Sequence, residues 1–349
     1  MSVSKPPSIA VCILNWNGKS LLEQYLPSVI AHSQYPNTQL VMIDNASTDD
    51  SISFVQKNYP QITLVCNTQN LGFVGGYNVG LKHVSADYYV LLNSDVAVTA
   101  NWIAPIVELM TNDPTIFAVQ PKIRSDLQPT YFEYAGAAGG CIDRLGYIFC
   151  RGRFFDVCEI DNGQYNTNTE VFWASGAAMF VRADAFWALG GLDTDFFAHM
   201  EEIDLCWRAK QAGYKIMVCP QSVVYHLGGG SLPYGSPRKL YYNFRNNLIM
   251  LYKNLRTFEL FILLPLRLLL DVVAAAKAAM GGKKNDATII LRADWHFVLN
   301  MMQWLQKRKI TQQLIAKNKL PNSRFVPTGR YNGSIIVDYF LLKKTKSPF

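Results

Sequence analysis

Three carboxylates within four positions, Glu201, Glu202 and Asp204, mark the segment with the clearest capacity for acid–base chemistry. They stand at the start of a predicted helix over 202–212, where the helix dipole partly accounts for them. Asp204 and Arg208 have the i,i+4 spacing of an ion pair, either on the surface or in a supporting position. On a helical wheel Glu202 points about 100° away from Glu201 and about 160° away from Asp204, so we expect no local partner for it. Glu202 is therefore the candidate general base.

A carboxylate and a histidine far apart in the sequence, Asp95 and His226, are candidates for holding a divalent cation. Asp95 ends the run Asn93-Ser94-Asp95 after an apolar segment, where it could coordinate a metal that carries a diphosphate. The same three residues also suit a turn into the next helix. His226 lies in the segment YHLGGGS (225–231), a flexible context for a ligand reaching in from a loop, although a lone histidine is more often structural.

Polar residues follow each of the first four apolar runs of the sequence. Ligands bind at the carboxyl ends of the strands in an open parallel sheet, so we expect these polar residues at one edge. Asp44 and Asn45 stand where a carboxylate and an amide could hold a nucleotide base, and both also suit turns and helix N-caps. Further residues in such positions are Asn15, Asn17, Asn93 and Ser94.

The glycine-rich stretch 70–80 follows the third apolar run and opens a predicted helix. Glycine lets the backbone approach a ligand closely, and free N–H groups at a helix start attract phosphate or sugar oxygens. A purely structural tight turn is the alternative. The stretch is not G-x-G-x-x-G after a first strand, which argues against an NAD site. The candidate binding residues in it are Asn70, Gly72, Gly75, Gly76 and Asn78.

The elements that must position these residues alternate along the first 120 residues. Apolar runs too continuous for half-exposed strands predict buried parallel strands, and the segments between them have helical length and spacing. This alternation predicts an α/β fold with a doubly wound, mostly parallel sheet. We expect strands at 8–14, 40–44, 62–66 and 88–92 and helices at 19–31, 50–59, 76–83 and 101–110.

The chain is less regular after residue 120. Residues 121–168 are rich in glycine and aromatic residues and predict an irregular excursion. The pattern then predicts one strand over 171–181, the helix over 202–212 and a strand over 215–219.

The C-terminal part of the chain differs in charge and apolar content. Residues 1–237 carry 13 Lys and Arg against 21 Asp and Glu, net −8, whereas residues 238–349 carry 20 against 5, net +15. The segment 258–280 is nearly long enough to span a bilayer, but its charged residues share one stripe of a helical wheel. This pattern favours a helix in a membrane surface, and packing on the body of the protein is the alternative. The stripe consists of Glu259, Arg267, Asp271 and Lys277.

Composition excludes several classes of protein. Half of the residues are hydrophobic and 17% are charged, which excludes an intrinsically disordered chain. Seven scattered cysteines form no C-x-x-C pair, so neither a disulfide framework nor a zinc site is expected, and reduced thiols in the cytoplasm are predicted. The N-terminus does not have the pattern of a secretion signal. The basic tail contains no recognition module for nucleic acid, so no nucleic-acid partner is expected.

Taken together, these segments resemble the large inverting glycosyltransferase family 2, which has the GT-A fold, and within it the rhamnosyltransferase-like branch. The resemblance covers about two-thirds of the chain through six colinear motifs. They are ILNWNG (13–18), VMIDNASTDDS (41–51), NTQNLGFVGGYNVG (67–80), YYVLLNSDV (88–96), the run from WASGAAMFV to KQAGY (173–214) and YHLGGGS (225–231).

The resemblance implies roles for the candidate residues. Asp44 would bind the base, and the other polar and glycine positions named above would surround a nucleotide-diphosphate sugar donor. Asp95 would bind Mn²⁺ or Mg²⁺ and His226 would complete the metal site, although Asn93 stands where the family often has a first Asp. The general base would fall on Glu202, where the family more often has Asp, with Glu201 and Asp204 as the other candidates. Trp173 and Gly176 would lie toward the acceptor or sugar, although core packing is an alternative for Trp173.

The implied function is transfer of one sugar, with inversion, in cell-surface polysaccharide synthesis. The donor would be dTDP-rhamnose or a UDP-sugar, and the acceptor a saccharide, free or linked to a polyprenyl diphosphate. We expect a catalytic domain over 1–237, with a nucleotide-sugar half to about residue 120 and an acceptor half after it. A helical basic extension over 238–349 would hold the enzyme on the inner face of the cytoplasmic membrane. The alternative function is a nucleotide-sugar-binding protein without catalytic activity.

Overall fold

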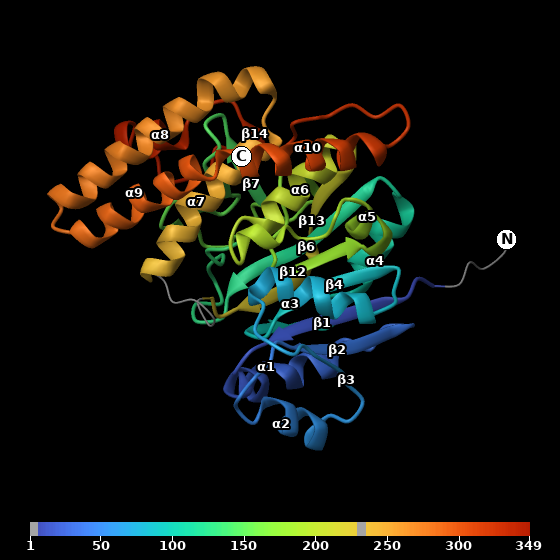
Figure 1. Ribbon diagram of the computed structural model, residues 1–349. Coiled ribbons are helices and arrows are strands. Elements are labelled where there is room, and N and C mark those ends of the chain that lie inside the picture. Colours follow the sequence, from blue (N-terminus) through green and yellow to red (C-terminus); the bar gives the residue numbers. More distant parts are fainter. Residues whose placement is uncertain (1–5, 229–234) are drawn as a thin grey trace.

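The structure, a computed structural model, describes residues 6–228 and 235–349 of the chain. A large mixed sheet forms its centre, with helices on both faces (Figure 1). The strand order is β11-β13-β6-β12-β4-β1-β2-β3, and the short β5 pairs with β13. The predicted α/β fold with a mostly parallel, doubly wound sheet is confirmed.

Parallel strands make up the N-terminal half of the sheet. β1 (Ile9–Asn15) pairs with β2 (Thr38–Asp44) and with β4 (Tyr88–Asn93), and β2 pairs with β3 (Thr63–Cys66). The four predicted strands are all present. The expectation of full burial is wrong for β3, whose residues are half-buried or exposed because β3 is the edge strand.

Successive side chains of β1 point to opposite faces of the sheet, and they pack into two separate hydrophobic cores. Ile9, Val11 and Ile13 pack on the face covered by α1 (Lys19–His32), α2 (Ser51–Asn58) and α4 (Ala104–Asn112). Ala10 and Cys12 pack on the opposite face with α3 (Gly72–Gly80) and the 3₁₀ turn Leu81–His83. Burial on both faces explains the continuous apolar runs of the sequence.

The second half of the sheet contains β5 (Val96–Val98), β6 (Ile116–Ser125), β11 (Thr169–Val171), β12 (Ala178–Arg182) and β13 (Lys215–His226). The single strand expected over 171–181 is wrong. The chain leaves β11 after Val171, and β12 begins at Ala178 and runs antiparallel to β4 and β6. The strand expected over 215–219 is too short, because β13 passes an irregularity after Cys219 and continues beside β6 to His226.

A second, smaller sheet occupies part of the segment that we expected to be irregular. Its order is β10-β9-β8-β7-β14. The last strand comes from the C-terminal part of the chain and pairs in parallel with β7, so the chain returns to the body near its end. The bounds are β7 (Gly140–Asp143), β8 (Ile148–Cys150), β9 (Arg153–Phe154), β10 (Val157–Cys158) and β14 (Arg330–Tyr331).

Helices dominate the rest of the chain. α5 (Ala183–Ala188) and α6 (Glu201–Gln211) follow β12, and between them lies the 3₁₀ turn Thr194–Phe196. α7 (Pro237–Asn254) is largely buried, α8 (Thr257–Met280) and α9 (Lys284–Leu299) extend to one side as a helical arm, and α10 (Met301–Lys317) runs back over the body (Figure 1). A short π-helical segment, Val337–Leu341, follows. The expected boundary at residue 237 coincides with the start of α7, and the division into two domains stays a prediction.

Buried ion pairs hold α6 against the C-terminal helices. Asp204 Oδ2 accepts from Arg208 Nε at 2.9 Å and from Lys253 Nζ at 2.8 Å, and its Oδ1 accepts from Asn254 Nδ2 at 2.7 Å. Lys253 and Lys307 of α10 both bind Asp193, in the loop before α6. A buried carboxylate with three donors is stable in its charged form, and removal of one partner leaves an uncompensated charge. This network fixes the position of the first turn of α6.

Candidate active site

Several predicted binding residues meet at the carboxyl ends of β1 and β2. Asn15 donates to Asp44 Oδ1 and to Ser47 Oγ, both at 3.1 Å, and the Ser47 backbone N–H donates to Asp44 Oδ2 at 2.8 Å. Asn17 receives a hydrogen bond from the Thr48 N–H at 2.7 Å. Asn15 and Asp44 are fully buried, so this cluster lies beneath the surface at the carboxyl ends of β1 and β2.

The amide of Asn45 joins this edge to the glycine-rich stretch. Its Nδ2 donates to Asn70 Oδ1 and to the Gly72 carbonyl, both at 2.9 Å, and its Oδ1 accepts from the Leu71 N–H at 3.2 Å. A side chain at Gly76 would collide with Leu14 and Asn45, which explains the glycine there. These contacts place Asn45, Asn70 and Gly72 next to one another, with Gly75 and Gly76 in the following turns of α3.

Asn78 lies apart from the residues just described. Its Nδ2 donates to the Leu192 carbonyl at 2.6 Å and its Oδ1 accepts from the Leu192 N–H at 3.1 Å. Both ends of the amide are thus occupied by the backbone of the loop before α6. The structure gives Asn78 a role in fixing that loop to α3, and a contact with a ligand stays a prediction.

Asp95 and His226 come together although 131 residues separate them in the sequence. β5 and β13 pair antiparallel with His226 opposite Val96, and the pairing brings His226 Nε2 to 3.2 Å from Asp95 Oδ1. Both side chains are about 5% exposed. Asn93 Nδ2 lies 3.5 Å from the same His226 nitrogen, and Ser94 lies between Asn93 and Asp95 in sequence. Of the predicted glycine-rich context, Gly229, Gly230 and Ser231 fall outside the described residues.

Asp95 and His226 supply two of the ligand types that divalent cations take in proteins. A carboxylate oxygen and an imidazole nitrogen converge at this point, and such ligands suit Mn²⁺ and, through the oxygen, Mg²⁺. Within residues 6–228 and 235–349 no group of three His, Cys, Asp or Glu side chains is arranged to hold a metal. Asp95 and His226 would therefore supply two ligands, and the remaining positions would be open to other oxygens.

Glu133 completes the surroundings of His226 and was not among our sequence candidates. Its Oε1 lies 3.4 Å from His226 Nδ1, on the side of the ring opposite Asp95. Burial would lower the pKa of His226, but Glu133 and Asp95 raise it to about 10. A carboxylate behind a metal-binding histidine fixes its orientation. Glu133 lies in the segment expected to be irregular, and no spacing in the sequence connects it with His226.

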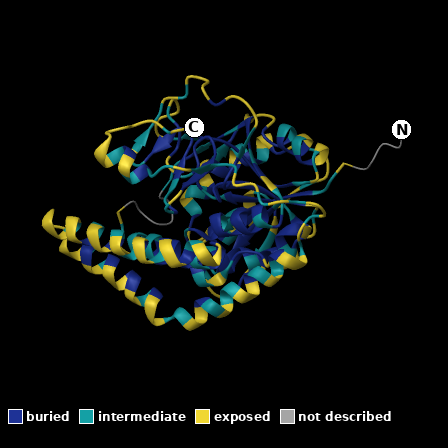
Figure 2. Ribbon diagram, turned by 90° about the horizontal axis from the view of Figure 1, so that it is seen from above, coloured by how far each residue is buried: buried dark blue, intermediate teal, exposed yellow. Residues whose placement is uncertain are grey.

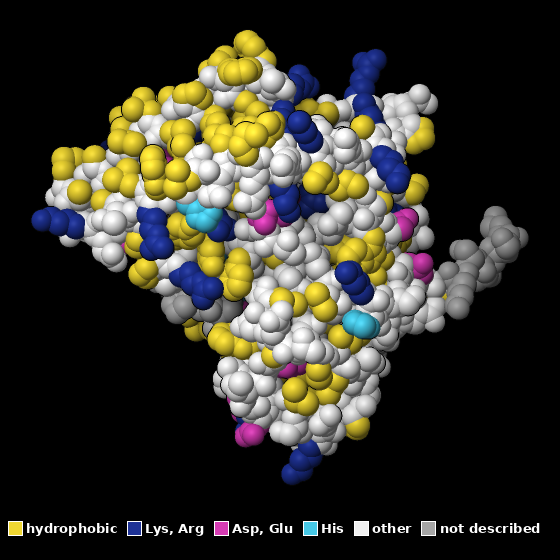
Figure 3. Space-filling model, in the orientation of Figure 1, with side chains coloured by type: hydrophobic (Ala, Val, Ile, Leu, Met, Phe, Trp, Pro, Cys, Tyr) yellow, Lys and Arg dark blue, Asp and Glu magenta, His cyan; other side chains and the backbone are white. Residues whose placement is uncertain are grey.

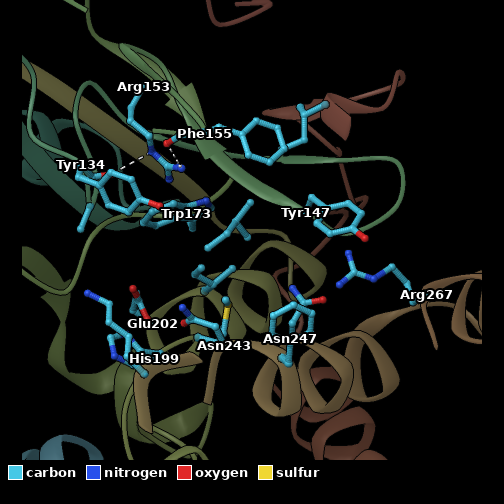
Figure 4. Close-up of a pocket in the computed structure, with 17 residues that line it drawn as sticks. Tyr134, Tyr147, Arg153, Phe155, Trp173, His199, Glu202, Asn243, Asn247 and Arg267 are labelled. Atoms are coloured by element: carbon cyan, nitrogen blue, oxygen red, sulfur yellow. Dashed lines mark hydrogen bonds between the residues drawn. The ribbon is translucent and has the colours of Figure 1, made fainter. Parts of the chain in front are cut away.

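Glu202 lines a cavity of about 310 Å³. Figure 4 shows Glu202 and His199 on one side of this cavity, with Tyr134 and Trp173 above them and Asn247 and Arg267 opposite. The Oε2 atom of Glu202 has no hydrogen-bond partner among the described residues. Burial raises the pKa of Glu202 to about 7.

The two other candidate bases have different surroundings. Burial and the neighbouring charge of Glu202 raise the pKa of Glu201, which is 5% exposed and does not line the cavity. Asp204 is fully buried and its oxygens are taken up by the network described above. Its pairing with Arg208 matches the expected supporting ion pair. Among the three carboxylates, Glu202 is the one that reaches a ligand-sized space.

The loop that leads into α6 is strained and is held by side chains of α7, among them Asn246. Phe197, His199 and Met200 have φ angles of 63°, 69° and 74°, which non-glycine residues rarely adopt. Asn246 Nδ2 on α7 contacts the carbonyl oxygens of Phe196, Ala198 and His199 at 3.0, 2.9 and 2.8 Å. Asn246 therefore positions the residues that immediately precede Glu202.

Trp173 and Gly176 connect the cavity with the sheet edge. Trp173 lines the cavity, and its Nε1 donates to the Cys141 carbonyl at 3.0 Å, so it is also part of the core. A Cβ at Gly176 would lie 3.5 Å from Phe73 of α3 and 3.9 Å from Glu202 Cβ. Gly176 therefore lies between Glu202 and Phe73 of the glycine-rich helix α3.

Sequence analysis missed most of the cavity lining. Four of the lining residues come from segments whose association rests on contacts distant in the chain. They are Tyr134 from the loop before β7, Tyr147 from the connection between β7 and β8, Asn247 from α7 and Arg267 from α8. One signal was available for Arg267, because it belongs to the polar stripe predicted within an apolar helix.

Comparison with known proteins identifies relatives of the part of the chain that contains the central sheet. A family model described as "Glycosyltransferase like family 2" matches residues 6–248. An N-acetylglucosaminyl-diphospho-decaprenol L-rhamnosyltransferase of Mycobacterium tuberculosis is 26% identical over 223 residues, which are 59% of this chain and 71% of that protein.

Two solved structures resemble the fold. S. aureus TarS 1–349 in complex with UDP-GlcNAc has a TM-score of 0.55 at 14% identity, over 89% of this chain and 88% of that one. GalNAc-T7 with UDP, GalNAc and Mn²⁺ has a TM-score of 0.54 at 18% identity, over 72% of this chain and about half (48%) of that one. Both likenesses concern the GT-A fold, which the mixed sheet and its covering helices share.

The raised pKa of Glu202 predicts a stability effect of Glu202→Gln that depends on pH. Between the ordinary glutamate pKa of 4.5 and about 7, the folded protein keeps a proton that the unfolded chain loses, so the free energy of unfolding of the wild type falls as pH rises. Glutamine does not titrate, so the E202Q variant does not lose stability in this way as pH rises. We expect E202Q and wild type to be similar at pH 4.5 and E202Q to be more stable at pH 8, by about 3 kcal/mol at most, since one pKa unit corresponds to about 1.4 kcal/mol.

Urea unfolding at the two pH values measures this difference. Glu108→Gln, at an exposed position of α4, is the matched control and should leave the two curves unchanged. An E202Q difference that is the same at both pH values would contradict the raised pKa.

Proposed function

The chain belongs to glycosyltransferase family 2, and we propose that it transfers one sugar from a nucleotide-diphosphate sugar to a hydroxyl group of a saccharide acceptor, with inversion at the anomeric carbon. The observation that carries the proposal is the position of Gly176 between two sites, where a Cβ would lie 3.5 Å from Phe73 of α3 and 3.9 Å from Glu202 Cβ. On one side lies the glycine-rich edge of the sheet, and on the other the cavity that contains Glu202. A donor at the edge would present its sugar toward that carboxylate.

The donor side consists of the polar residues at the carboxyl ends of β1, β2 and β4. Asp44 and Asn45 would hold the base. The glycine-rich start of α3, where the Leu71 and Gly72 N–H groups already donate to Asn45 and Asn70, would let the diphosphate approach the backbone closely. We propose dTDP-rhamnose or a UDP-sugar as the donor. A rhamnosyltransferase among the relatives supports the first, and the UDP-GlcNAc complex of TarS, which has the same fold, is compatible with the second.

Asp95 and His226 would hold Mn²⁺ or Mg²⁺ in the loaded enzyme. The ion would neutralise the charge that gathers on the diphosphate leaving group. Glu133 keeps the imidazole of His226 in place from the far side of the ring. The Mn²⁺ in the GalNAc-T7 complex, which shares the fold, is consistent with this assignment.

Glu202 acts as the general base. The acceptor oxygen forms a bond to the anomeric carbon, the bond from that carbon to the diphosphate oxygen breaks, and the hydroxyl proton passes to the carboxylate of Glu202. A pKa near 7 suits this role, because the group is largely ionised at slightly alkaline pH and still basic enough to accept the proton. Attack from the Glu202 side, opposite the leaving group, accounts for inversion.

We propose an acceptor saccharide linked to a polyprenyl diphosphate, in the synthesis of a cell-surface polysaccharide. The rhamnosyltransferase relative acts on such a substrate by its name. All seven cysteines are unpaired in the structure, which supports the reducing cytoplasm as the compartment. The enzyme would then meet its acceptor at the inner face of the cytoplasmic membrane.

The helical arm offers a surface for that encounter. Two residues of the polar stripe of α8, Arg267 and Asp271, are 2% and 1% exposed and face the protein, whereas Lys277 of the same stripe is exposed. The apolar side of α8 faces outward. Figures 2 and 3 show this exposed, hydrophobic side of the arm. Cations flank it at Arg256, Lys283 and Lys284. The apolar face of α8 consists of Phe258, Phe261, Ile262, Leu266, Leu269, Val272, Val273 and Met280.

This orientation fits a helix that lies in a membrane surface. Among the helices of the described residues, none combines the length and apolar content needed to cross a bilayer. An outward apolar face of this extent, with lysines and arginines at its ends, is typical of interfacial binding. We therefore propose peripheral association through α8.

The proposed chemistry predicts that Glu202→Gln loses transfer and keeps donor binding. Removing a general base costs about 10²- to 10⁴-fold in rate. Calorimetric titration with UDP, dTDP and GDP, with and without Mn²⁺, should show metal-dependent binding of one nucleotide with equal affinity in wild type and E202Q. Loss of binding in proportion to the loss of rate would contradict the role of Glu202, and Glu108→Gln serves as the control.

The proposed membrane contact predicts that Phe258→Ser with Phe261→Ser weakens binding to vesicles of anionic lipid. These side chains are 76% and 79% exposed, so their replacement should leave the fold intact. Leu127→Ser, at a 74% exposed apolar residue outside the arm, is the matched control. Co-sedimentation of the double variant at the wild-type level would show that the arm does not contact the lipid.

A further inference from the structure

A buried arginine closes the side of the cavity opposite Glu202. Arg267 on α8 is 2% exposed and lines the cavity. Its guanidinium lies 3.6 Å from the centre of the Tyr147 ring, and Figure 4 shows the two side chains together on that side. Nη2 reaches Asp271 Oδ1 at 3.5 Å, whereas Nε and Nη1 have no hydrogen-bond partner among the described residues.

Unfilled donors on a buried arginine are costly, because the charge has lost its water without gaining full replacement. The other arginine in the cavity wall shows the contrast. Arg153 donates to the Tyr134 carbonyl at 3.0 Å and to the Phe155 carbonyl at 3.3 Å, so its position is explained by the fold. Arg267 has no such explanation, and two of its donors stay available to an anion in the cavity.

Three carboxyl groups and one phenol lie near the guanidinium of Arg267. The groups near it are Asp271, Asp294, Asp143 and the phenol of Tyr147. Burial raises the pKa of Asp271 to about 6 and, together with Asp271, that of Asp294 to about 7. Asp143 also has its pKa raised by burial, to about 6, and its oxygens accept from backbone N–H groups. Asp271, which contacts Nη2, orients the guanidinium rather than filling the two free donors.

The remaining cavity lining suits a sugar between Glu202 and Arg267. Asn247 donates from Nδ2 to the Gly146 carbonyl at 3.0 Å, and its buried Oδ1 has no partner among the described residues, so it can accept from a hydroxyl group. Trp173 supplies an aromatic wall. A volume of about 310 Å³ is at the small end of ligand sites, which run from about 300 to 1,000 Å³, and fits one sugar with a linked phosphate.

We propose that this cavity is the acceptor subsite and that Arg267 binds the phosphate next to the acceptor sugar. The inference rests on the proposed function, because it assumes that Glu202 receives the proton of the acceptor hydroxyl. The sugar then spans the cavity, with its reacting hydroxyl at Glu202 and its anomeric phosphate at Arg267. Arg267 thereby selects acceptors that are glycosyl phosphates or diphosphates over neutral glycosides.

Direct binding tests this without relying on transfer. The probes are N-acetylglucosaminyl diphosphate with a short prenyl chain, the neutral prenyl N-acetylglucosaminide and inorganic pyrophosphate. The wild type should bind the glycosyl diphosphate at least tenfold more tightly than either of the others. Arg267→Gln should lose at least tenfold of this affinity, Arg267→Lys should keep part of it, and nucleotide binding should be unchanged in both.

The outcomes separate this inference from the proposed function. Equal affinity of the wild type for charged and neutral glycosides would overturn the inference even if no Arg267 variant folds, and so would equal affinity for pyrophosphate. Wild-type affinity for the glycosyl diphosphate in a folded R267Q would overturn it as well. Absence of binding to any nucleotide in the wild type would instead count against the proposed function.

Discussion

The buried carboxylate of Asp204 is the interaction on which the site depends. It accepts from Arg208 on its own helix and from Lys253 and Asn254 on α7, and Lys253 passes the connection on to Asp193. Through these contacts the helix that carries Glu202 is fixed to the helix that forms the opposite wall of the cavity. Lys307 of α10 also binds Asp193, so the network joins α6, α7 and α10.

The same region contains features that are locally unfavourable, namely a strained backbone and desolvated carboxyl groups. The loop before α6 holds three non-glycine residues at positive φ, and Asn246 on α7 must bond three of its carbonyl groups to keep it there. Of two adjacent carboxylates, Glu201 is buried and Glu202 is half-buried, and both have raised pKa values. Strain and desolvation of this kind are typical of functional sites, where the surrounding packing compensates for them. The compensation here comes from α7, which makes it part of the catalytic unit.

How far the sequence predicts this molecule depends on the range of the contacts. The first four strands and the helices between them follow from local patterns. The polar residues at the ends of β1, β2 and β4, which begin at Asn15, Asp44 and Asn93, meet at one edge of the sheet. Local sequence patterns do not predict contacts between segments that are distant in the chain. The bulge in β13 that carries His226 to Asp95, and the packing of Glu133 and Arg267 around the site, depend on tertiary structure alone. The orientation of α8 was also undetermined, because a polar stripe can face either water or a protein cavity.

The central claim is that Glu202, with a pKa near 7, takes the proton of the acceptor hydroxyl. The most direct test is the pH dependence of the transfer rate between pH 5 and 9, measured with saturating donor, acceptor and Mn²⁺. The account predicts a rate that rises tenfold per pH unit at acidic pH and levels off above about pH 7. A rate that is independent of pH over this range, in an enzyme that still transfers sugar, would contradict it.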